Sequence, residues 1–255
     1  MVLLAHIREQ HHLSLGSYGR PRMTQELKEI GLSVGHRRVG RLMLDNRIYL
    51  IRTHKYKATT DSHHRFNTAP NVLDGNFSAQ RPNQKWAGDI SYIWTAEGWL
   101  YLAVMMDLDS RGIVGWALSN RLKRDLALQA LDRAIALRNP PQGCIHHTDR
   151  GSQYCSYEYQ NRLQQLGLQV SMSGKGNCYD NAAVLRRENN PLNCFLILLT
   201  FFKTLKAELI WRHNWATRDH VTQALFQHIN GFYNNSRRHL ATGGVSSATF
   251  EGKTA

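Results

Sequence analysis

The stretch Trp86-Ala87-Gly88-Asp89-Ile90-Ser91-Tyr92 places a carboxylate inside a run of aromatic and large apolar residues. Such a run predicts a β-strand, and an acid within a strand is costly to bury unless it is paired or bound to a metal. A second acid, Asp149, stands where the short segment 144–147, a further predicted strand, gives way to a Gly-containing loop. Two carboxylates on neighbouring strands can hold two divalent cations that clamp the reacting oxygens of a phosphodiester. The plain alternatives are a solvated strand edge for Asp89 and a turn-capping acid for Asp149.

The segments around these two acids define an order of elements. Residues 86–93, 100–107 and 112–118 predict an antiparallel meander of three strands. Apolar spacing and turn residues then predict, in order, a helix at 124–138, a strand at 144–147, a helix at 157–166, a strand at 168–171 and a last helix at 217–233. This is the order of a ribonuclease H-like domain, an α/β fold with a mixed five-stranded sheet and helices. In that fold the first and fourth strands are neighbours, so we expect Asp89 and Asp149 to lie close together.

Other residues that could bind a metal carry weaker signals. Asp107 and Asp109 lie at the far end of the second predicted strand, beside a Gly-containing turn that explains Asp109. The four cysteines form no CxxC pair, so neither a zinc ribbon nor a disulfide framework is indicated. Adjacent histidines, as in His146-His147, point to different faces of a strand or helix and seldom bind one ion together.

The N-terminal part of the chain predicts a small all-α module that binds nucleic acid. The formal net charge is +13, and residues 1–60 hold eleven Lys/Arg against four Asp/Glu. Residues 24–30, with Thr24 as N-cap, and residues 34–46 predict two helices joined by a Gly-containing turn. This is the pattern of a helix-turn-helix whose second helix enters the major groove. The exposed residues expected to contact DNA are His36, Arg37, Arg38 and Arg41; a solvated helical hairpin is the plain alternative.

The resulting domain prediction has three parts. Residues 1–60 form the helix-turn-helix domain, 61–80 a basic linker and 81–255 the ribonuclease H-like domain. The most apolar segment, 192–199, is far too short to span a bilayer, and the N-terminus lacks the apolar core of a signal peptide. We therefore expect a cytoplasmic protein with no membrane partner.

Several motifs together resemble the second-reading-frame (OrfB-type) transposase of the IS-three family of bacterial insertion elements, which carries a DDE integrase catalytic core. The resemblance runs from about residue 15 to the C-terminus. The motifs are YGRPR (18–22), PNQKW (82–86), DISYI (89–93), DLDSR (107–111), IVGW (113–116), HTDRGSQY (147–154), SMSGKGNCYDNA (171–182), FFKTLK (201–206) and YNNSRRH (233–239).

The resemblance implies a DNA transposase that cleaves element ends and joins them to target DNA. It implies that Asp89 and Asp149 are the catalytic, metal-binding residues of a two-metal Mg²⁺ or Mn²⁺ site. Lys175, Arg237 and Arg238, which lie in the shared motifs, are expected to contact DNA. The implied partners are element-end and target DNA, further copies of the chain on paired ends, and the upstream-frame protein of the same element.

The third acid of the family pattern is missing from its expected position. It would follow Asp149 after thirty-five residues, in a Glu-Ser pair directly before FFKTLK, but the count reaches Leu185. Residues 185–200 stand there instead, as an atypical insertion. Glu188, the only acid in this segment, is displaced by about 4.5 Å and about 60° if the segment is helical. The apolar run at 195–199, within the same inserted segment, has no expected place on a solvated catalytic helix.

The sequence therefore leaves two functions open. One is an active transposase, with metal-dependent cleavage and strand transfer of element ends. The alternative is a catalytically dead DNA-binding protein that occupies those ends. A ribonuclease H-type nuclease is a third interpretation, and the N-terminal module and the motif at 233–239 disfavour it.

Overall fold

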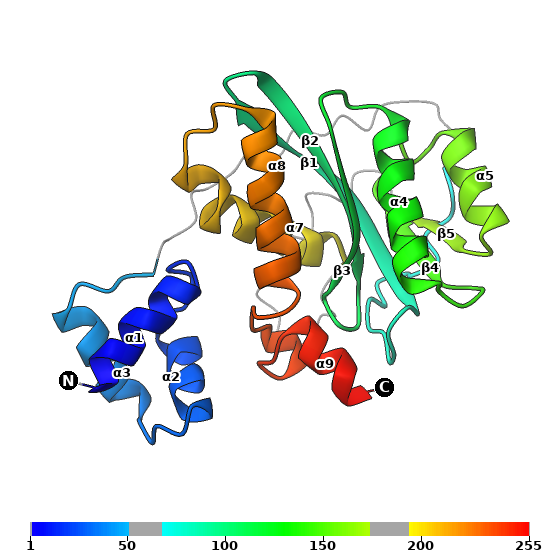
Figure 1. Ribbon diagram of the computed structural model, residues 1–255. Coiled ribbons are helices and arrows are strands. Elements are labelled where there is room, and N and C mark those ends of the chain that lie inside the picture. Colours follow the sequence, from blue (N-terminus) through cyan, green and yellow to red (C-terminus); the bar gives the residue numbers. More distant parts are fainter. Residues whose placement is uncertain (1, 51–67, 174–193, 255) are drawn as a thin grey trace. The chain divides into compact units, whose positions relative to one another are not determined.

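The computed structural model describes residues 2–50, 68–173 and 194–254, and its elements are labelled in Figure 1. The chain divides into two compact units. One unit comprises Met1–Tyr56 and Lys203–His213; the other comprises Lys57–Phe202 and Asn214–Ala255. The boundaries predicted at residues 60 and 80 stay predictions, because much of the proposed linker lies outside the described residues.

The N-terminal unit begins with three helices. These are α1 (Val2–Leu13), α2 (Arg20–Glu29) and α3 (His36–Asp45). Their apolar core is formed by Ile7, Met23, Leu27, Val39 and Met43, all of which are buried. The unit also contains the C-terminal end of α7 (Cys194–Glu208) and the 3-10 helix η1 (Ile210–Arg212).

The predicted start of α2, which the sequence placed at residue 24, was wrong. The helix begins at Arg20 with Gly19 as N-cap, and Pro21 occupies its first turn. Pro is favoured there because its fixed φ suits the helix and its missing N–H would have no helical partner. Thr24 is instead buried within the helix, and its hydroxyl donates to the carbonyl of Arg20 at 2.8 Å. The first helix, α1, was not predicted.

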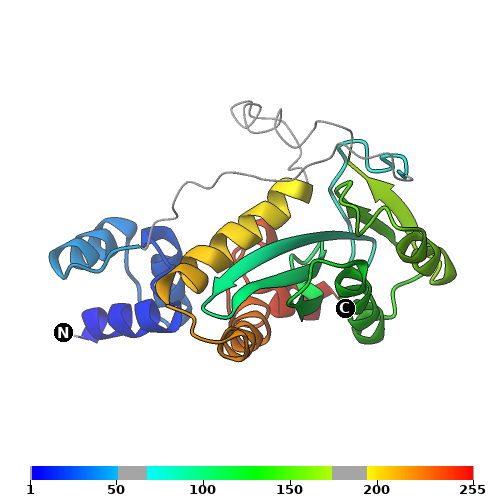
Figure 2. The same cartoon turned by 90° about the horizontal axis from the view of Figure 1, so that it is seen from above.

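The second unit is built on a five-stranded mixed sheet, as predicted. Its strands are β1 (Lys85–Thr95), β2 (Gly98–Asp107), β3 (Ile113–Ser119), β4 (Ile145–Thr148) and β5 (Gln169–Met172). Their order in the sheet is β3-β2-β1-β4-β5. The first three strands are antiparallel, whereas β1 pairs with β4, and β4 with β5, in parallel. Figure 2 shows β1 and β2 as the long twisted hairpin of the sheet.

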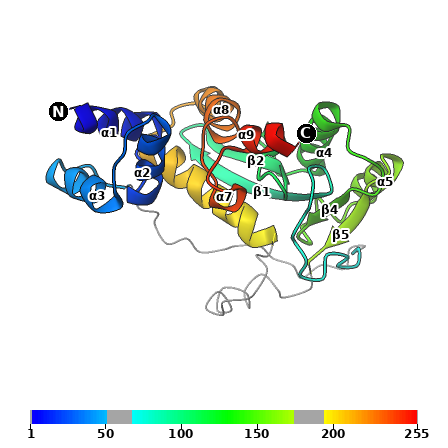
Figure 3. The same ribbon diagram turned by 90° about the horizontal axis from the view of Figure 1, so that it is seen from below.

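One face of the sheet is covered by α4 (Arg124–Arg138) and α5 (Tyr157–Gln165). Figure 3 shows α5 beside β4 and β5. The packing of α4 on β3 depends on Gly115, since a Cβ there would lie 2.4 Å from the carbonyl oxygen of Ala130 and 2.6 Å from Cβ of Ala134. The shared core includes Trp86, Tyr154 and Tyr159, each of which is at most 1% exposed.

The opposite face of β3 meets α8 (Arg218–Phe226), which continues into the π-helical segment η2 (Gln227–Tyr233). Successive strand residues point to opposite faces. Accordingly, Gly115 faces α4, whereas the Trp116 ring lies 6.4 Å from that of Phe226. The side-chain amide of Asn234 then pairs with both backbone groups of Ile113, at 2.9 Å each, and so satisfies this part of the edge strand.

The helix at residues 217–233 is not the last one, contrary to prediction. The 3-10 helix η3 (Leu240–Thr242) and α9 (Ser247–Thr254) follow it. Glu251 on α9 accepts two hydrogen bonds from the guanidinium of Arg138 on α4, at 2.6 and 2.9 Å. This bidentate ion pair, in which both side chains are about one-fifth exposed, fixes the C-terminal helix to the sheet layer.

The predicted insertion is partly a helix. Residues 185–193 lie outside the described residues, but 194–200 form the first half of α7, and Leu198 is 2% exposed. Within the apolar run at 195–199, Leu198 therefore packs in the interior, whereas Ile197 and Leu199 are half-buried. No helix among the described residues is long and apolar enough to cross a membrane.

Gly115→Ala is expected to lower the free energy of unfolding by about 1–3 kcal/mol, because the added methyl meets the backbone of α4 and cannot be accommodated by a rotamer change. Urea unfolding followed by tryptophan fluorescence measures the loss. Gly231→Ala is the matched control, since its Cβ would meet nothing within 4 Å. Equal stability of the two variants would contradict this account of the packing.

Candidate active site

Strand register places Asp89 and Asp149 at the same level of the sheet. The parallel pairing of β1 and β4 ends at Gly88 and Thr148, and each acid is the next residue along its chain. Residues that share a register position on parallel strands have their side chains on the same side of the sheet. Both acids are half-buried. The structure therefore gives the two acids that the sequence singled out neighbouring backbone positions, directly after the last paired residues of β1 and β4.

Backbone amides orient both carboxylates. Oδ1 of Asp89 accepts from the N–H of Ile90 at 2.7 Å, and Oδ1 of Asp149 accepts from the N–H of Gly151 at 2.9 Å. A Cβ at position 151 would lie 3.0 Å from Oδ1 of Asp149. Glycine therefore permits the close approach of this loop to the carboxylate, as expected for a loop that must turn tightly beneath a functional acid.

A buried phenol lies in the turn that follows Asp149. Tyr154 is 1% exposed, and burial raises its pKa well above the ordinary value, with further increases from the charges of Tyr159, Asp89 and Asp149. Sequence reasoning did not single out Tyr154, although it closes the HTDRGSQY motif five residues after Asp149.

The two histidines of β4 support the site from opposite faces of the sheet. His146 is fully buried, its Nε2 lies 2.8 Å from the Tyr159 hydroxyl, and burial together with His147 lowers its pKa to about 3. His147 pairs through Nδ1 with the hydroxyl of Ser171 at 2.8 Å, and burial lowers its pKa to about 4. Both rings are neutral packing groups at physiological pH.

Asp107 has a structural role. It is 1% exposed, and its carboxylate accepts backbone N–H groups from Asn83, Asp109 and Ser110 at 2.6, 2.8 and 3.1 Å. Burial raises the pKa of Asp107, and these hydrogen bonds act in the opposite direction. Asp107, more than Asp109, holds the turn between β2 and β3.

The donor set suits a hard divalent cation. Mg²⁺ takes carboxylate oxygens and retains waters, so one or two carboxylates plus a substrate phosphate suffice. Among the described residues, no group of three or more His, Cys, Asp or Glu side chains could hold a metal. Leu185, Glu188 and Lys175 lie in the segment 174–193, outside the described residues. The catalytic and metal-binding roles of Asp89 and Asp149 stay predictions.

The predicted DNA-contacting residues differ in exposure. His36, Arg37, Arg38 and Arg41 are all exposed on α3, whose buried side carries Val39 and Met43. None of them takes part in an ion pair within the described part of the chain. The recognition-helix pattern therefore presents its charges to solvent, as a helix that binds phosphates must.

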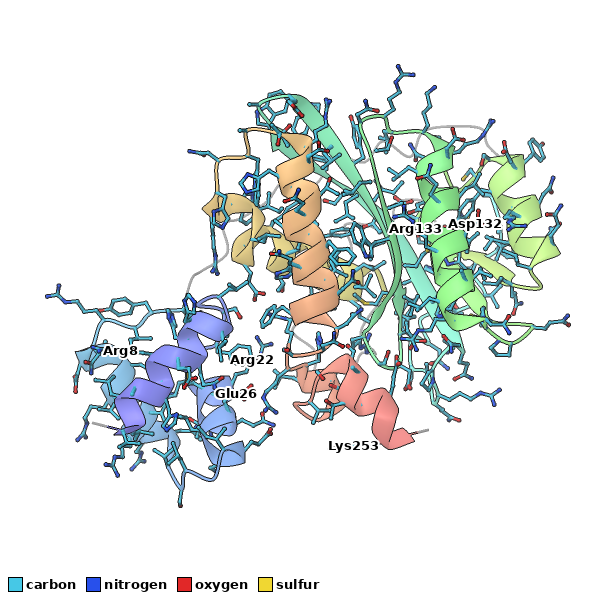
Figure 4. The ribbon with its side chains drawn as sticks, viewed as in Figure 1. Arg8, Arg22, Glu26, Asp132, Arg133 and Lys253 are labelled. Atoms are coloured by element: carbon cyan, nitrogen blue, oxygen red, sulfur yellow. The ribbon has the colours of Figure 1, made fainter. Side chains whose placement is uncertain are left out.

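Other cations serve the fold. Arg237 is 5% exposed, and this burial argues against the predicted direct contact with DNA. Arg238 is half-buried and donates to the carbonyl of Gly244 at 2.9 Å. Figure 4 shows Asp132 and Arg133 on α4; Arg133 donates to the carbonyl of Trp116 at 2.9 Å. Basic composition alone does not distinguish such cations from those that face DNA.

Comparison with protein families confirms the predicted fold class. Residues 79–178 match the family described as Integrase core domain, and residues 200–254 match a second family of the same description. Residues 2–56 match the HTH-like domain. The N-terminal helices and the mixed sheet thus correspond to two known domain types.

Individual relatives cover nearly the whole chain. The 31 kDa protein of insertion element IS600 from Shigella sonnei is 40% identical over 252 residues, which cover 99% of this chain and 86% of that protein. Transposase InsF for insertion sequence IS3A from Escherichia coli strain K12 is 40% identical over 236 residues, which cover 92% of this chain and 77% of that protein.

A solved structure shares the fold at low identity. It is the cryo-electron microscopy structure of the simian T-cell lymphotropic virus intasome in complex with the PP2A regulatory subunit B56 gamma. Its TM-score is 0.50 at 17% identity, with coverage of 96% of this chain and 74% of that chain. At this identity the likeness shows the fold alone.

Burial of neutral His146 predicts that stability falls in acid. Its pKa is about 3 in the folded chain against an ordinary 6.5, so the unfolded chain takes up the proton at higher pH. This contribution is complete above about pH 6.5 and is lost as the pH falls toward 3. The free energy of unfolding, measured with urea from pH 7 to 4, should fall less steeply with decreasing pH in His146→Gln than in the unmodified chain. His12→Gln, at an exposed histidine, is the control. If the free energy of unfolding depends on pH equally in His146→Gln and in the unmodified chain, buried His146 is not the cause of the acid sensitivity.

Proposed function

Because the chain belongs to the family of IS3 insertion-sequence transposases, we propose that it performs metal-dependent cleavage and strand transfer of its element's ends through Asp89 and Asp149. The observation that carries this proposal is the parallel pairing of β1 with β4, which gives the two acids one level in the sheet. Both are half-buried, so a phosphate can approach them while the sheet fixes their backbones.

The protein's own part in the reaction is positioning. A bound Mg²⁺ or Mn²⁺ would polarise the scissile phosphate and activate the attacking oxygen. Asp89 and Asp149 would hold the cation, and the N–H groups of Ile90 and Gly151 keep their carboxylates oriented. Since the chemistry of phosphoryl transfer depends mainly on alignment and charge, a rigid carboxylate pair supplies what the reaction needs.

DNA is the proposed partner of both units. The exposed face of α3 would bind the element ends, and the carboxylate pair would act on end and target DNA. We also propose assembly of several copies on paired ends, a contribution from the upstream-frame protein of the same element, and action on the DNA of the bacterial cytoplasm. The net charge of +13 supports a polyanionic partner.

Asp89→Asn and Asp149→Asn are each expected to reduce Mn²⁺-dependent cleavage of a duplex carrying the element end by about 100-fold or more, because each removes a charge that holds the cation. Both variants should still bind that duplex in a gel-shift assay. Asp109→Asn is the matched control, because it removes an equal charge in the turn between β2 and β3. This variant should cleave normally. Full cleavage by Asp89→Asn would contradict the proposed site.

Two further variants in the same assay test the effect of the missing third acid. Leu185→Glu restores a carboxylate at the counted position and leaves α7 intact, whereas replacing residues 185–200 by Glu-Ser also removes the first half of α7. Cleavage by the Leu185→Glu chain alone would place the defect at the third acid. If neither chain cleaves while both bind the ends, the chain is a DNA-binding protein without transposase chemistry.

Arg37→Ala and Arg38→Ala are each expected to weaken binding to the element end and to reduce the slope of log K against log salt by about 1, because each removes one phosphate-neutralising charge. Fluorescence anisotropy at several salt concentrations measures both quantities. Lys28→Ala, an exposed cation on α2, serves as the control of equal charge change. Equal slopes in all four chains would exclude α3 as the binding helix.

A further inference from the structure

The hairpin of β1 and β2 exposes aromatic rings near its turn. One face of this end is core, since Ile93, Leu100 and Leu102 are at most 4% exposed. The opposite face carries Trp94, which is 59% exposed, and Trp99, which is 43% exposed. In an antiparallel sheet with one buried face, the other face is normally polar. Two exposed indoles at such positions therefore call for an explanation.

The rings form one continuous cluster. Trp94 and Trp99 are direct cross-strand partners, and their ring centroids lie 4.7 Å apart, edge to face. The half-buried Tyr92 extends the cluster along the strand, with its ring 5.2 Å from that of Trp99. Cross-strand aromatic pairs stabilise a hairpin, so a purely structural role is the plain alternative.

The end of the hairpin is also held from the side of α8. The N–H of Ala96 donates to the carbonyl of Trp215 at 2.9 Å, and the N–H of Arg218 donates to the carboxylate of Glu97 at 2.9 Å. The guanidinium of Arg218 donates to the carbonyls of Glu97 and Trp99, at 2.6 and 3.3 Å. The geometry of the turn therefore does not depend on the rings alone, and the indoles stand on a fixed support.

Exposed cations lie on the same side of the sheet as the rings, in the loop that follows β3. Ser119, the last residue of β3, pairs with Tyr101, which in turn pairs with Tyr92, so this loop begins level with the ring cluster. Figure 1 shows the hairpin turn and the loop from β3 to α4 at the same end of the sheet. Arg121 and Lys123 are exposed, and neither takes part in an ion pair among the residues that the structure describes.

A hollow connects this loop with the turn that follows Asp149. Its volume is about 390 Å³, and its lining includes Lys123 on one side and Ser152 and Gln153 on the other. The surface that carries the rings and cations therefore borders the segment that carries a proposed catalytic acid.

We propose that Tyr92, Trp94, Trp99, Arg121 and Lys123 form an aromatic–basic surface that binds unpaired DNA, with bases stacked on the rings and phosphates near the cations. The choice of DNA as the occupant rests on the proposed function. Proteins that bind single strands combine positive charge with aromatic side chains, because every base offers a π-face. The net charge of +13 favours a polyanion, whereas a second copy of the chain would bring like charges together.

Trp99→Leu and Trp99→Phe test the stacking. The affinity of the full chain for a fluorescein-labelled oligothymidylate of about 12 nucleotides is measured by fluorescence anisotropy. Leucine keeps an apolar side chain but has no π-face, so Trp99→Leu should bind about tenfold more weakly. Trp99→Phe should retain most of the affinity. Neither variant should change the slope of log K against log salt, because neither changes the charge.

Arg121→Ala and Lys123→Ala test the cations. Each should weaken binding and reduce the slope of log K against log salt by about 0.7, the contribution of one neutralised phosphate on a single strand. Phe226→Ala is the matched control for the rings. Phe226 is 59% exposed, as Trp94 is, but it lies on α8 at the opposite face of the sheet, so its removal should change neither affinity nor slope.

Thermal unfolding shows which variants are folded, and Trp94→Leu provides the same test if Trp99→Leu does not fold. Unchanged oligothymidylate affinity in the folded tryptophan-to-leucine variant would overturn the proposal. Sedimentation velocity without DNA tests a second copy of the chain as the occupant. If Trp99→Leu yields smaller species and binds oligothymidylate as the unmodified chain does, the surface is a protein interface and the proposal is overturned.

The duplex assays separate this proposal from the proposed function. If the unmodified chain cleaves the element end but binds oligothymidylate no better than Trp99→Leu, the proposed function stands and the role of the aromatic–basic surface falls. If oligothymidylate binding depends on Trp99 while the unmodified chain and Asp89→Asn cleave equally or not at all, the surface stands and the proposed function falls.

Discussion

The parallel pairing of β1 with β4 is the constraint on which the rest of the catalytic unit depends. Gly88 leaves room at this level, because a Cβ at this position would lie 2.8 Å from the His146 ring and 3.0 Å from the sulfur of Met105. With glycine there, His146 packs under the strand and pairs with Tyr159. A larger residue would force the His146 ring or the Met105 side chain to shift, one position before Asp89.

Much of the catalytic fold could be predicted from sequence because its signals are local. The meander follows from alternating strand residues and Gly-containing turns, and α4 was predicted to the residue from its apolar spacing and the Pro-Pro that follows it. The start of α2 carried a local signal that was overlooked, the proline in its first turn. Helix α9 could not be predicted, because it is held by a tertiary contact, the ion pair of Arg138 with Glu251, which no local pattern encodes.

Some residues of the candidate site could likewise be predicted from the sequence, and others could not. Asp89 could be found because an acid within an apolar strand pattern is unusual, and Asp149 because it stands where a short predicted strand meets a Gly-containing loop. Tyr154 could not, because a tyrosine in a core pattern looks the same whether or not its hydroxyl has a partner. Arg237 shows the converse: its place in a shared motif suggested a contact with DNA, yet it is 5% exposed, because a motif gives the identity of a side chain and not its surroundings.

Helix α7 includes residues 194–200 of the atypical segment 185–200 and shows how the fold accommodates them. Its buried positions Leu198, Phe201, Phe202 and Leu205 recur at the spacing of one helical face. Leu198 belongs to the atypical segment and the other three to the motif that follows, so the apolar face crosses the junction without a change of phase. The fold has therefore accommodated the C-terminal part of the segment as ordinary helix. The buried face of α7 therefore gives no sign of disrupted packing at the junction between the atypical segment and the motif that follows it.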